Sequence, residues 1–271
     1  MWILKELFNI SNKKEAPVQP VLSLRLGDRH LAYSITNGSG EELYQLGYYR
    51  TEEADATDFS GLLEQVPALK ESFYQVQVAY DYNTSTLVPM LQFPAEEAGS
   101  LLKSLFGPNG NEAVVTETLA EWQLHNVYTV PAGILQLIRQ QYPAARSRHQ
   151  FSLGLHKLNA AGEQGLMLVD FRQDDFTVLL GRSGKLLLAQ TYGYATPEDV
   201  LYYMVKICNQ LSLSRQETTL QLSGLIDQES ALYKELSQYF LQLEFRSGNW
   251  PETGFPDHFF TVLNDLARCA S

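Results

Sequence analysis

The chain has 271 residues, and its 20 lysines and arginines against 31 aspartates and glutamates give a formal net charge of −11. At about 150 residues per domain, this length predicts two domains or one large α/β unit with a substantial core. The negative balance argues against a nucleic-acid-binding protein, because phosphate backbones are bound mainly by basic side chains. Two cysteines provide neither a disulfide framework nor a metal quartet. This favours a reducing compartment, and we expect the cytoplasm.

The first ten residues are apolar but are interrupted by Lys5 and Glu6. They lack the cleavage site of a secretory signal, and no segment approaches the ~20 apolar residues of a transmembrane helix. We expect a short amphipathic helix that packs on its own domain, followed by a polar linker up to residue 20. The alternative is a weak contact of residues 1–10 with a membrane or a partner.

The first third of the chain predicts the element order β-β-β-α-β. Apolar and polar residues alternate in short runs separated by turns rich in glycine, asparagine and aspartate, which is typical of strands. Thr57 and Asp58 predict the start of a helix after the third strand. The expected strands are residues 21–26, 31–35, 43–51 and 76–80, with a turn at residues 27–29 after the first.

The second half repeats this order, and the internal duplication is the strongest signal in the sequence. Thr196 to Asp199 has the pattern of a capping box, with proline at the first helical position. The expected strands are residues 165–171, 176–180, 185–191, 219–222 and 241–245. The last helix is expected over residues 259–266.

Between the copies the pattern is less regular. A helix is expected over residues 94–106, then a hairpin over 112–130 and a helix opened by Pro131. A strand over residues 144–149 and a helix over 151–158 then complete the first copy. We therefore divide the chain into an N-terminal helix and linker (1–20), a first domain (21–161) and a second domain (162–271).

A duplicated β-β-β-α-β unit, with a candidate ligand turn after the first strand of each copy, resembles the actin-like ATPase superfamily. Its members include sugar kinases, the heat-shock chaperone ATPase domain and actin-like cytoplasmic proteins of pilus and secretion machines. Leu87-Val88-Pro89 and the tail Asp257-His258-Phe259-Phe260 more narrowly resemble an uncharacterised bacterial family with this fold. The resemblance implies two ribonuclease-H-like α/β domains with mixed sheets flanked by helices.

The resemblance also identifies where phosphate would bind. Active members carry an Asp-x-Gly-Thr turn in the first hairpin, whereas the run from Arg25 to Asp28 keeps only the glycine, Gly27. Arginine cannot act as a base or bind Mg²⁺, and an acid at the Asp28 position would repel phosphate. The alternative is that Gly27 and Asp28 form an ordinary β-turn.

The other two loops are also altered. The run from Asp170 to Arg172 keeps the acid of the second Asp-x-Gly turn but loses its glycine, and Gly224 is the one glycine retained of a Gly-Gly turn. An arginine obstructs the close backbone approach that glycine permits. Asp170 has the alternative role of capping its own turn.

These changes predict a catalytically inactive pseudo-enzyme that binds a protein partner, as a scaffold, through its interdomain cleft or its surface. We expect no cofactor and no metal. The remnant nucleotide cleft would comprise Arg25, Gly27, Asp28, Asp170, Arg172 and Gly224. The alternative is an ATPase or phosphotransferase that binds Mg²⁺ through Asp170 or Asp28 and the phosphates of ATP through Arg25 or Arg172. A third hypothesis is a membrane-proximal platform that uses residues 1–10.

Tyrosines, of which the chain has 15, gather on predicted elements of both copies. The groups are Tyr44, Tyr48, Tyr49, Tyr80 and Tyr82, and Tyr192, Tyr194, Tyr202 and Tyr203. Aromatic residues on strands usually pack half-buried against neighbours, which is the role that we expect. The alternative is a groove for a protein partner, because tyrosine is enriched at interfaces.

Overall fold

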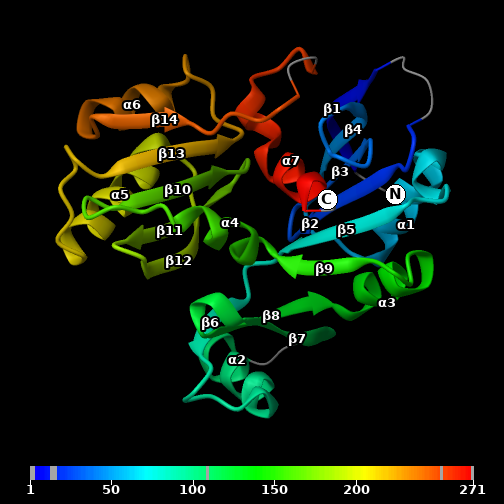
Figure 1. Ribbon diagram of the computed structural model, residues 1–271, viewed down its shortest axis with the longest axis horizontal. Coiled ribbons are helices and arrows are strands. Elements are labelled where there is room, and N and C mark those ends of the chain that lie inside the picture. The colour runs from blue at the N-terminus through cyan, green and yellow to red at the C-terminus, as the bar shows by residue number, and fades with distance from the viewer. Residues whose placement is uncertain (1–3, 13–16, 108–109, 251–252, 270–271) are drawn as a thin grey trace. The chain divides into compact units, whose positions relative to one another are not determined.

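The computed structural model describes residues 4–12, 17–107, 110–250 and 253–269 (Figure 1). The chain folds into two compact units, residues 1–152 with 263–271 and residues 153–262. We expected the boundary between residues 161 and 162. The division into compact units instead lies between residues 152 and 153, and it assigns residues 263–271 to the first unit. No helix within the described residues is long and apolar enough to cross a membrane.

The first unit contains a six-stranded sheet in the order β1-β4-β3-β2-β5-β9. β2, β3 and β4 form an antiparallel meander, as expected, and β5 runs parallel to β2 and β9 parallel to β5. The strands are β1 (Lys5–Ser11), β2 (Val21–Gly27), β3 (His30–Thr36), β4 (Leu43–Arg50), β5 (Gln75–Asp81) and β9 (Arg146–His149).

One face of this sheet is apolar and carries the core of the first unit. Leu22 and Leu24 of β2 and Val78 of β5 point to this face and are fully buried. They pack with side chains of α1 (Ala56–Gln65) and α3 (Ala132–Gln141). The N-cap of α1 is Asp55, whose side chain accepts hydrogen bonds from two backbone amides, so the cap expected at Thr57 and Asp58 was placed too late.

The expected N-terminal helix is wrong. Residues 5–11 form β1, which pairs antiparallel with β4, and residues 1–3 lie outside the described residues. Ile10 is buried, and the Phe8 ring packs edge-on against Tyr48. Pairing with the edge of β4 gives this segment interstrand hydrogen bonds. A ten-residue helix, in contrast, is only marginally stable without tertiary packing.

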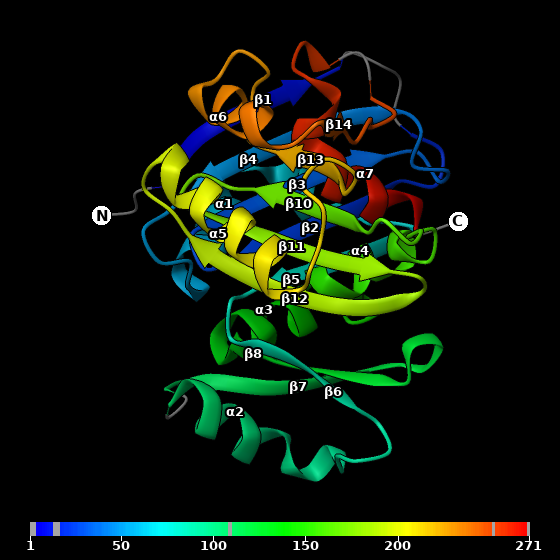
Figure 2. The same ribbon diagram turned by 90° about the vertical axis from the view of Figure 1, so that its left-hand side faces the viewer.

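A small antiparallel sheet is inserted between β5 and α3. The expected hairpin is confirmed as β7 (Glu112–Leu119) and β8 (Leu124–Pro131), and β6 (Ser85–Pro89) adds a strand that we did not predict. Figure 2 shows α2 (Ala98–Phe106) beside this sheet, where Ala98 and Leu102 pack against Val127. Short 3-10 helices span Pro67–Lys70 (η1), Ala95–Glu97 (η2) and Ala120–Trp122 (η3).

The second unit has a five-stranded sheet in the order β12-β11-β10-β13-β14, which matches the order β4-β3-β2-β5-β9 of the first unit. The expected mixed α/β class is therefore confirmed. The strands are β10 (Leu166–Phe171), β11 (Asp175–Arg182), β12 (Lys185–Gly193), β13 (Thr219–Gly224) and β14 (Gln242–Phe245).

Helices cover both faces of the second sheet. Val169 of β10 packs on one face with Met204 of α5 (Pro197–Gln210) and Leu236 of α6 (Ala231–Tyr239). α4 (Gln150–Leu158) covers the other face from residue 153 on, where Leu158 lies close to Gly181. The expected capping box is present: Thr196 accepts from the amide of Asp199, whose carboxylate accepts from the Thr196 amide.

The chain ends in a 3-10 helix, η5 (Asp257–Phe260), followed by α7 (Thr261–Arg268). His258 of η5 is buried, and its ring stacks on Phe245 with centroids 4.0 Å apart. Its Nε2 lies 2.6 Å from the Ile226 carbonyl oxygen, so a neutral ring that carries its proton on Nε2 satisfies this contact. Burial lowers the pKa of His258 below 6.5.

This lowered pKa predicts a loss of stability in acid. The unfolded chain binds a proton at residue 258 more readily than the folded chain, so the stabilisation is complete above pH ~6.5 and falls as the pH drops below that value. We expect His258→Gln to lose less unfolding free energy than the wild type between pH 7.5 and 5.5, measured by urea unfolding. His156→Gln, at an exposed position, is the control and should keep the wild-type loss. A wild-type loss in His258→Gln as well would contradict this role.

Candidate functional site

Arg25 lies near the carboxyl end of β2, on the sheet face opposite the apolar core. Its guanidinium is buried and donates from Nε and Nη2 to Oδ2 of Asp81, over 3.0 and 2.7 Å. Nη2 also donates to Oε1 of Gln150, 2.9 Å away. Asp81 ends the neighbouring parallel strand β5 and is equally buried. Arg25 is therefore held inside its own unit by a buried ion pair.

Gly27 ends β2, and Asp28 begins the turn that follows it. A Cβ on Gly27 would collide with the ring of His30 and lie 2.7 Å from the Asp81 carbonyl oxygen, so glycine is required by packing between strands. The Asp28 carboxylate accepts a hydrogen bond from the Asn83 amide over 3.0 Å. Both residues thus have structural roles, Gly27 at the end of β2 and Asp28 in the turn.

Asp170 lies on β10, on the face opposite the apolar core of the second unit. It stands in register with Ser223 of β13 on one side and Thr177 of β11 on the other. Ser223 donates its hydroxyl proton to Oδ1 of Asp170 over 2.8 Å, and Nη1 of Arg172 is 3.6 Å from Oδ2. Asp170 is buried, so these neighbours rather than water stabilise its charge.

Arg172 is also engaged within its own unit. Its Nε is paired with the carboxylate of Asp175, and its Nη2 donates to the Thr177 hydroxyl over 3.0 Å. The Tyr194 hydroxyl donates to the Arg172 carbonyl oxygen over 2.8 Å. Burial raises the pKa of Tyr194 to about 12, so this hydroxyl stays protonated at neutral pH. Asp170, Asp175, Thr177 and Tyr194 therefore all contact Arg172.

Gly224 ends β13 with φ at +79°, a conformation that favours glycine. A Cβ there would collide with the carbonyl oxygen of Phe171 and lie 2.8 Å from its amide nitrogen. The next amide, of Leu225, donates to the same Phe171 oxygen over 2.8 Å. The glycine is explained by the close packing of β10 and β13.

The structure adds residues that sequence reasoning missed. Asp81, on the strand beside Arg25, is the counterion of that arginine. Ser223, on the strand beside Asp170, donates a hydrogen bond to that aspartate. Asp81 directly follows the predicted strand 76–80, so an acid at that strand end was the available signal. Its pairing with Arg25 depends on the strand order, which the sequence pattern alone does not give.

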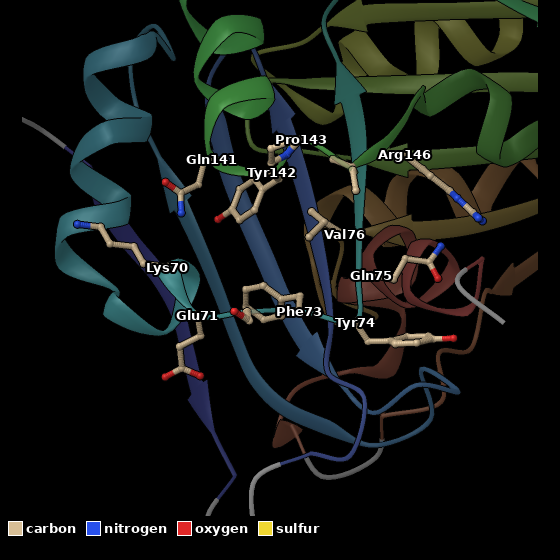
Figure 3. Close-up of a pocket in the computed structure, with 13 residues that line it drawn as sticks. Lys70, Glu71, Phe73, Tyr74, Gln75, Val76, Gln141, Tyr142, Pro143 and Arg146 are labelled. Carbon is tan, nitrogen blue, oxygen red and sulfur yellow. The ribbon is translucent and has the colours of Figure 1, made fainter.

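A pocket of about 610 Å³ lies elsewhere on the first unit, at the amino ends of β5 and β9. Figure 3 shows the rings of Phe73 and Tyr142 in its middle, with Lys70 on one side and Arg146 on the other. The Tyr142 hydroxyl donates to the Leu69 carbonyl oxygen over 2.7 Å, which joins the two segments that line the pocket. Ligands of open α/β sheets bind at the carboxyl ends of strands, so this pocket is distinct from the expected nucleotide position.

A family model described as "Protein of unknown function (DUF3822)" matches residues 10–243. The chain belongs to this family. The match includes Leu87-Val88-Pro89 but ends before the aromatic tail at residues 257–260. No curated protein matches the chain.

Solved structures establish the fold. A Bacteroides thetaiotaomicron protein with an actin-like ATPase fold and unknown function is 22% identical and has a TM-score of 0.73, with 84% of this chain and 91% of that chain covered. A chain of the PilM–PilN type IV pilus biogenesis complex is 15% identical and has a TM-score of 0.59, with 94% and 99% covered. This chain of the DUF3822 family therefore has the actin-like ATPase fold, as the resemblance implied.

The buried ion pair makes Asp81 a sensitive position. Asp81→Asn leaves the Arg25 charge buried without its carboxylate, and breaking such a pair typically costs about 3 kcal/mol or more. We expect a loss of that size in the urea unfolding free energy. Asp28→Asn, in the adjacent turn, is the control and should cost less than about 1 kcal/mol. Equal, small losses in both variants would show that Asp81 does not stabilise Arg25.

Gly224 provides a second test. Gly224→Ala places a Cβ in a left-handed conformation and against the Phe171 backbone, so we expect a loss of at least ~2 kcal/mol in unfolding free energy. Gly184 also has a positive φ, of +70°, but its Cβ would meet no atom within 4 Å. Gly184→Ala therefore measures the cost of the backbone conformation alone. Equal losses in the two variants would contradict the packing role of Gly224.

Proposed function

We propose that this DUF3822 protein is a binding module with an actin-like fold that does not hydrolyse ATP. The observation that carries this proposal is the buried Arg25–Asp81 pair. It puts a positive charge where active members of the superfamily carry the acid that organises Mg²⁺, and it engages Asp81 as the counterion. Arginine has neither a lone pair for a metal nor basicity for proton abstraction.

The second unit supports the same proposal. A side chain that holds phosphate must present unsatisfied donors to it, and Arg172 directs Nε and Nη2 to Asp175 and Thr177 instead. The Asp170 carboxylate accepts from Ser223 and lies near Arg172, so its charge is balanced without a metal ion. For Mg-ATP to bind here, these contacts would have to break, and contacts with the metal and the phosphates would have to replace them.

A protein is the partner that we favour. One structure with this fold is a chain of the PilM–PilN type IV pilus biogenesis complex, which supports a protein as the partner of this chain. The pocket around Phe73 and Tyr142 offers an aromatic surface of the kind that protein interfaces use. Binding through the interdomain cleft stays a prediction. Cys208 and Cys269 are free thiols, in keeping with a cytoplasmic protein.

The second candidate is a nucleotide-dependent enzyme, and one observation favours it. Asp170 keeps an acid at the carboxyl end of the first strand of the second unit, where the superfamily places one. In this hypothesis Asp170 binds Mg²⁺, and the charges around it rearrange when ATP binds.

Thermal unfolding with and without millimolar Mg-ATP, Mg-ADP and Mg-GTP separates the two candidates. A ligand at ~100 times its dissociation constant stabilises a fold by about 2.7 kcal/mol, which raises the melting temperature visibly. We expect no shift beyond that of Mg²⁺ with a non-nucleotide polyphosphate. A nucleotide shift that Asp170→Ala abolishes, and that Asp174→Ala in the adjacent turn leaves intact, would contradict the proposal and support the enzyme.

A further inference from the structure

β12 is the outermost strand of the second sheet, and among the described residues no strand pairs with its free edge. It spans nine residues and pairs only with β11 on its inner side. The outer edge of such a strand presents backbone N–H and C=O groups that another strand can pair with.

The other outer strands carry features that discourage pairing. β9 and β14 are only four residues long. Charges or proline lie on the outer strands as well, at Lys5, Glu6, Pro89, Glu112, Glu117, Arg146, Arg148 and Glu244. β12 also has an irregularity, at Leu187 in its pairing with β11, but it has no charge, proline or glycine from Leu186 to Tyr192. Its edge is the long, uncharged kind that favours strand addition.

An aromatic surface adjoins this edge. The ring of Tyr192 on β12 packs on Tyr203 of α5, with centroids 4.5 Å apart. Tyr202 beside it is 60% exposed, and the Lys206 ammonium lies 5.5 Å from the Tyr202 ring centroid. A strand added to β12 would gain side-chain contacts with these rings as well as backbone hydrogen bonds.

The two ends of β12 carry opposite charge. Arg182 and the exposed Lys185 lie at the hairpin that begins the strand. The other end of the strand is acidic. Asp174 lies next to it, since its carbonyl oxygen accepts a hydrogen bond from the Tyr194 amide, and the exposed Glu198 follows in the first turn of α5. An antiparallel copy of the same strand brings the positive end of each copy to the negative end of the other.

We propose that β12 pairs antiparallel with β12 of a second copy of this chain. A two-fold axis at Ala189 pairs Leu188 of each copy with Gln190 of the other. It brings the Lys185 end of each strand to the Gly193 end of the other, so no like charges face each other. Such a contact is self-complementary and closed, as in most homodimers. It joins the two five-stranded sheets into one and needs no nucleotide, so it stands independently of the proposed function.

Sedimentation velocity of the full chain over micromolar to submillimolar concentrations tests the dimer. We expect a monomer–dimer equilibrium, which Gln190→Lys weakens by about ten-fold or more because it places a charge beside the axis on each copy. Gln190 is exposed in the single chain, so the substitution leaves the fold intact, which circular dichroism verifies. A monomer at every concentration, or a dimer unaffected by Gln190→Lys, would overturn the proposal. A monomer whose β12 amides gain protection from hydrogen exchange only with an extended peptide would overturn it in favour of a different partner.

Charge reversal tests the antiparallel arrangement. Lys185→Glu and Glu198→Lys should each raise the dimer dissociation constant about five-fold, because each places like charges at both ends of the paired strands. The double variant should return to the wild-type value, since the opposite charges face each other again. If the double variant instead raised the dissociation constant by the product of the two single effects, the antiparallel pairing would be overturned.

Discussion

An arginine buried in a β-sheet must be given an opposite charge, because removing an ion from water costs several kcal/mol unless an ion pair and hydrogen bonds compensate. In the first unit Arg25 is this residue, and Asp81 and Gln150 provide the compensation. The pair links β2 to β5, the central parallel strands, and Gln150 brings in the first residue of α4. The carboxyl end of β2 is consequently a structural centre in which the side chains satisfy one another.

The second unit reaches the same result with other residues. There the acid lies on the first strand, and its hydrogen-bond partner is Ser223 from the parallel strand beside it. The arginine follows in the turn and is held by Asp175 three residues later. In both units a charge at the expected phosphate position is balanced from within. These contacts stabilise the ends of the two strands at which the superfamily motifs are expected.

Local signals predicted most of the fold. The alternation in β2 and β3 and the capping box around Thr196 depend on neighbours in the chain, and both were confirmed. β1 was predicted as a helix because its pairing with β4 joins residues far apart in sequence. The same limit applies to the site: the identity of Arg25 was plain in the sequence, but its partner Asp81 is 56 residues away. Motif comparison identified the altered positions, and only the register of β2 and β5 shows how they are compensated.

Arg25 and Asp81 stabilise each other in this account, and a double-mutant cycle measures their interaction energy most directly. Urea unfolding free energies of the wild type, Arg25→Met, Asp81→Asn and the double variant give the coupling energy of the pair. Because each single change leaves one buried group without its partner, the double variant should lose less than the sum of the single losses. We predict a coupling of about 2 kcal/mol or more. Losses that simply add would contradict the account, because the two charges would then be independent.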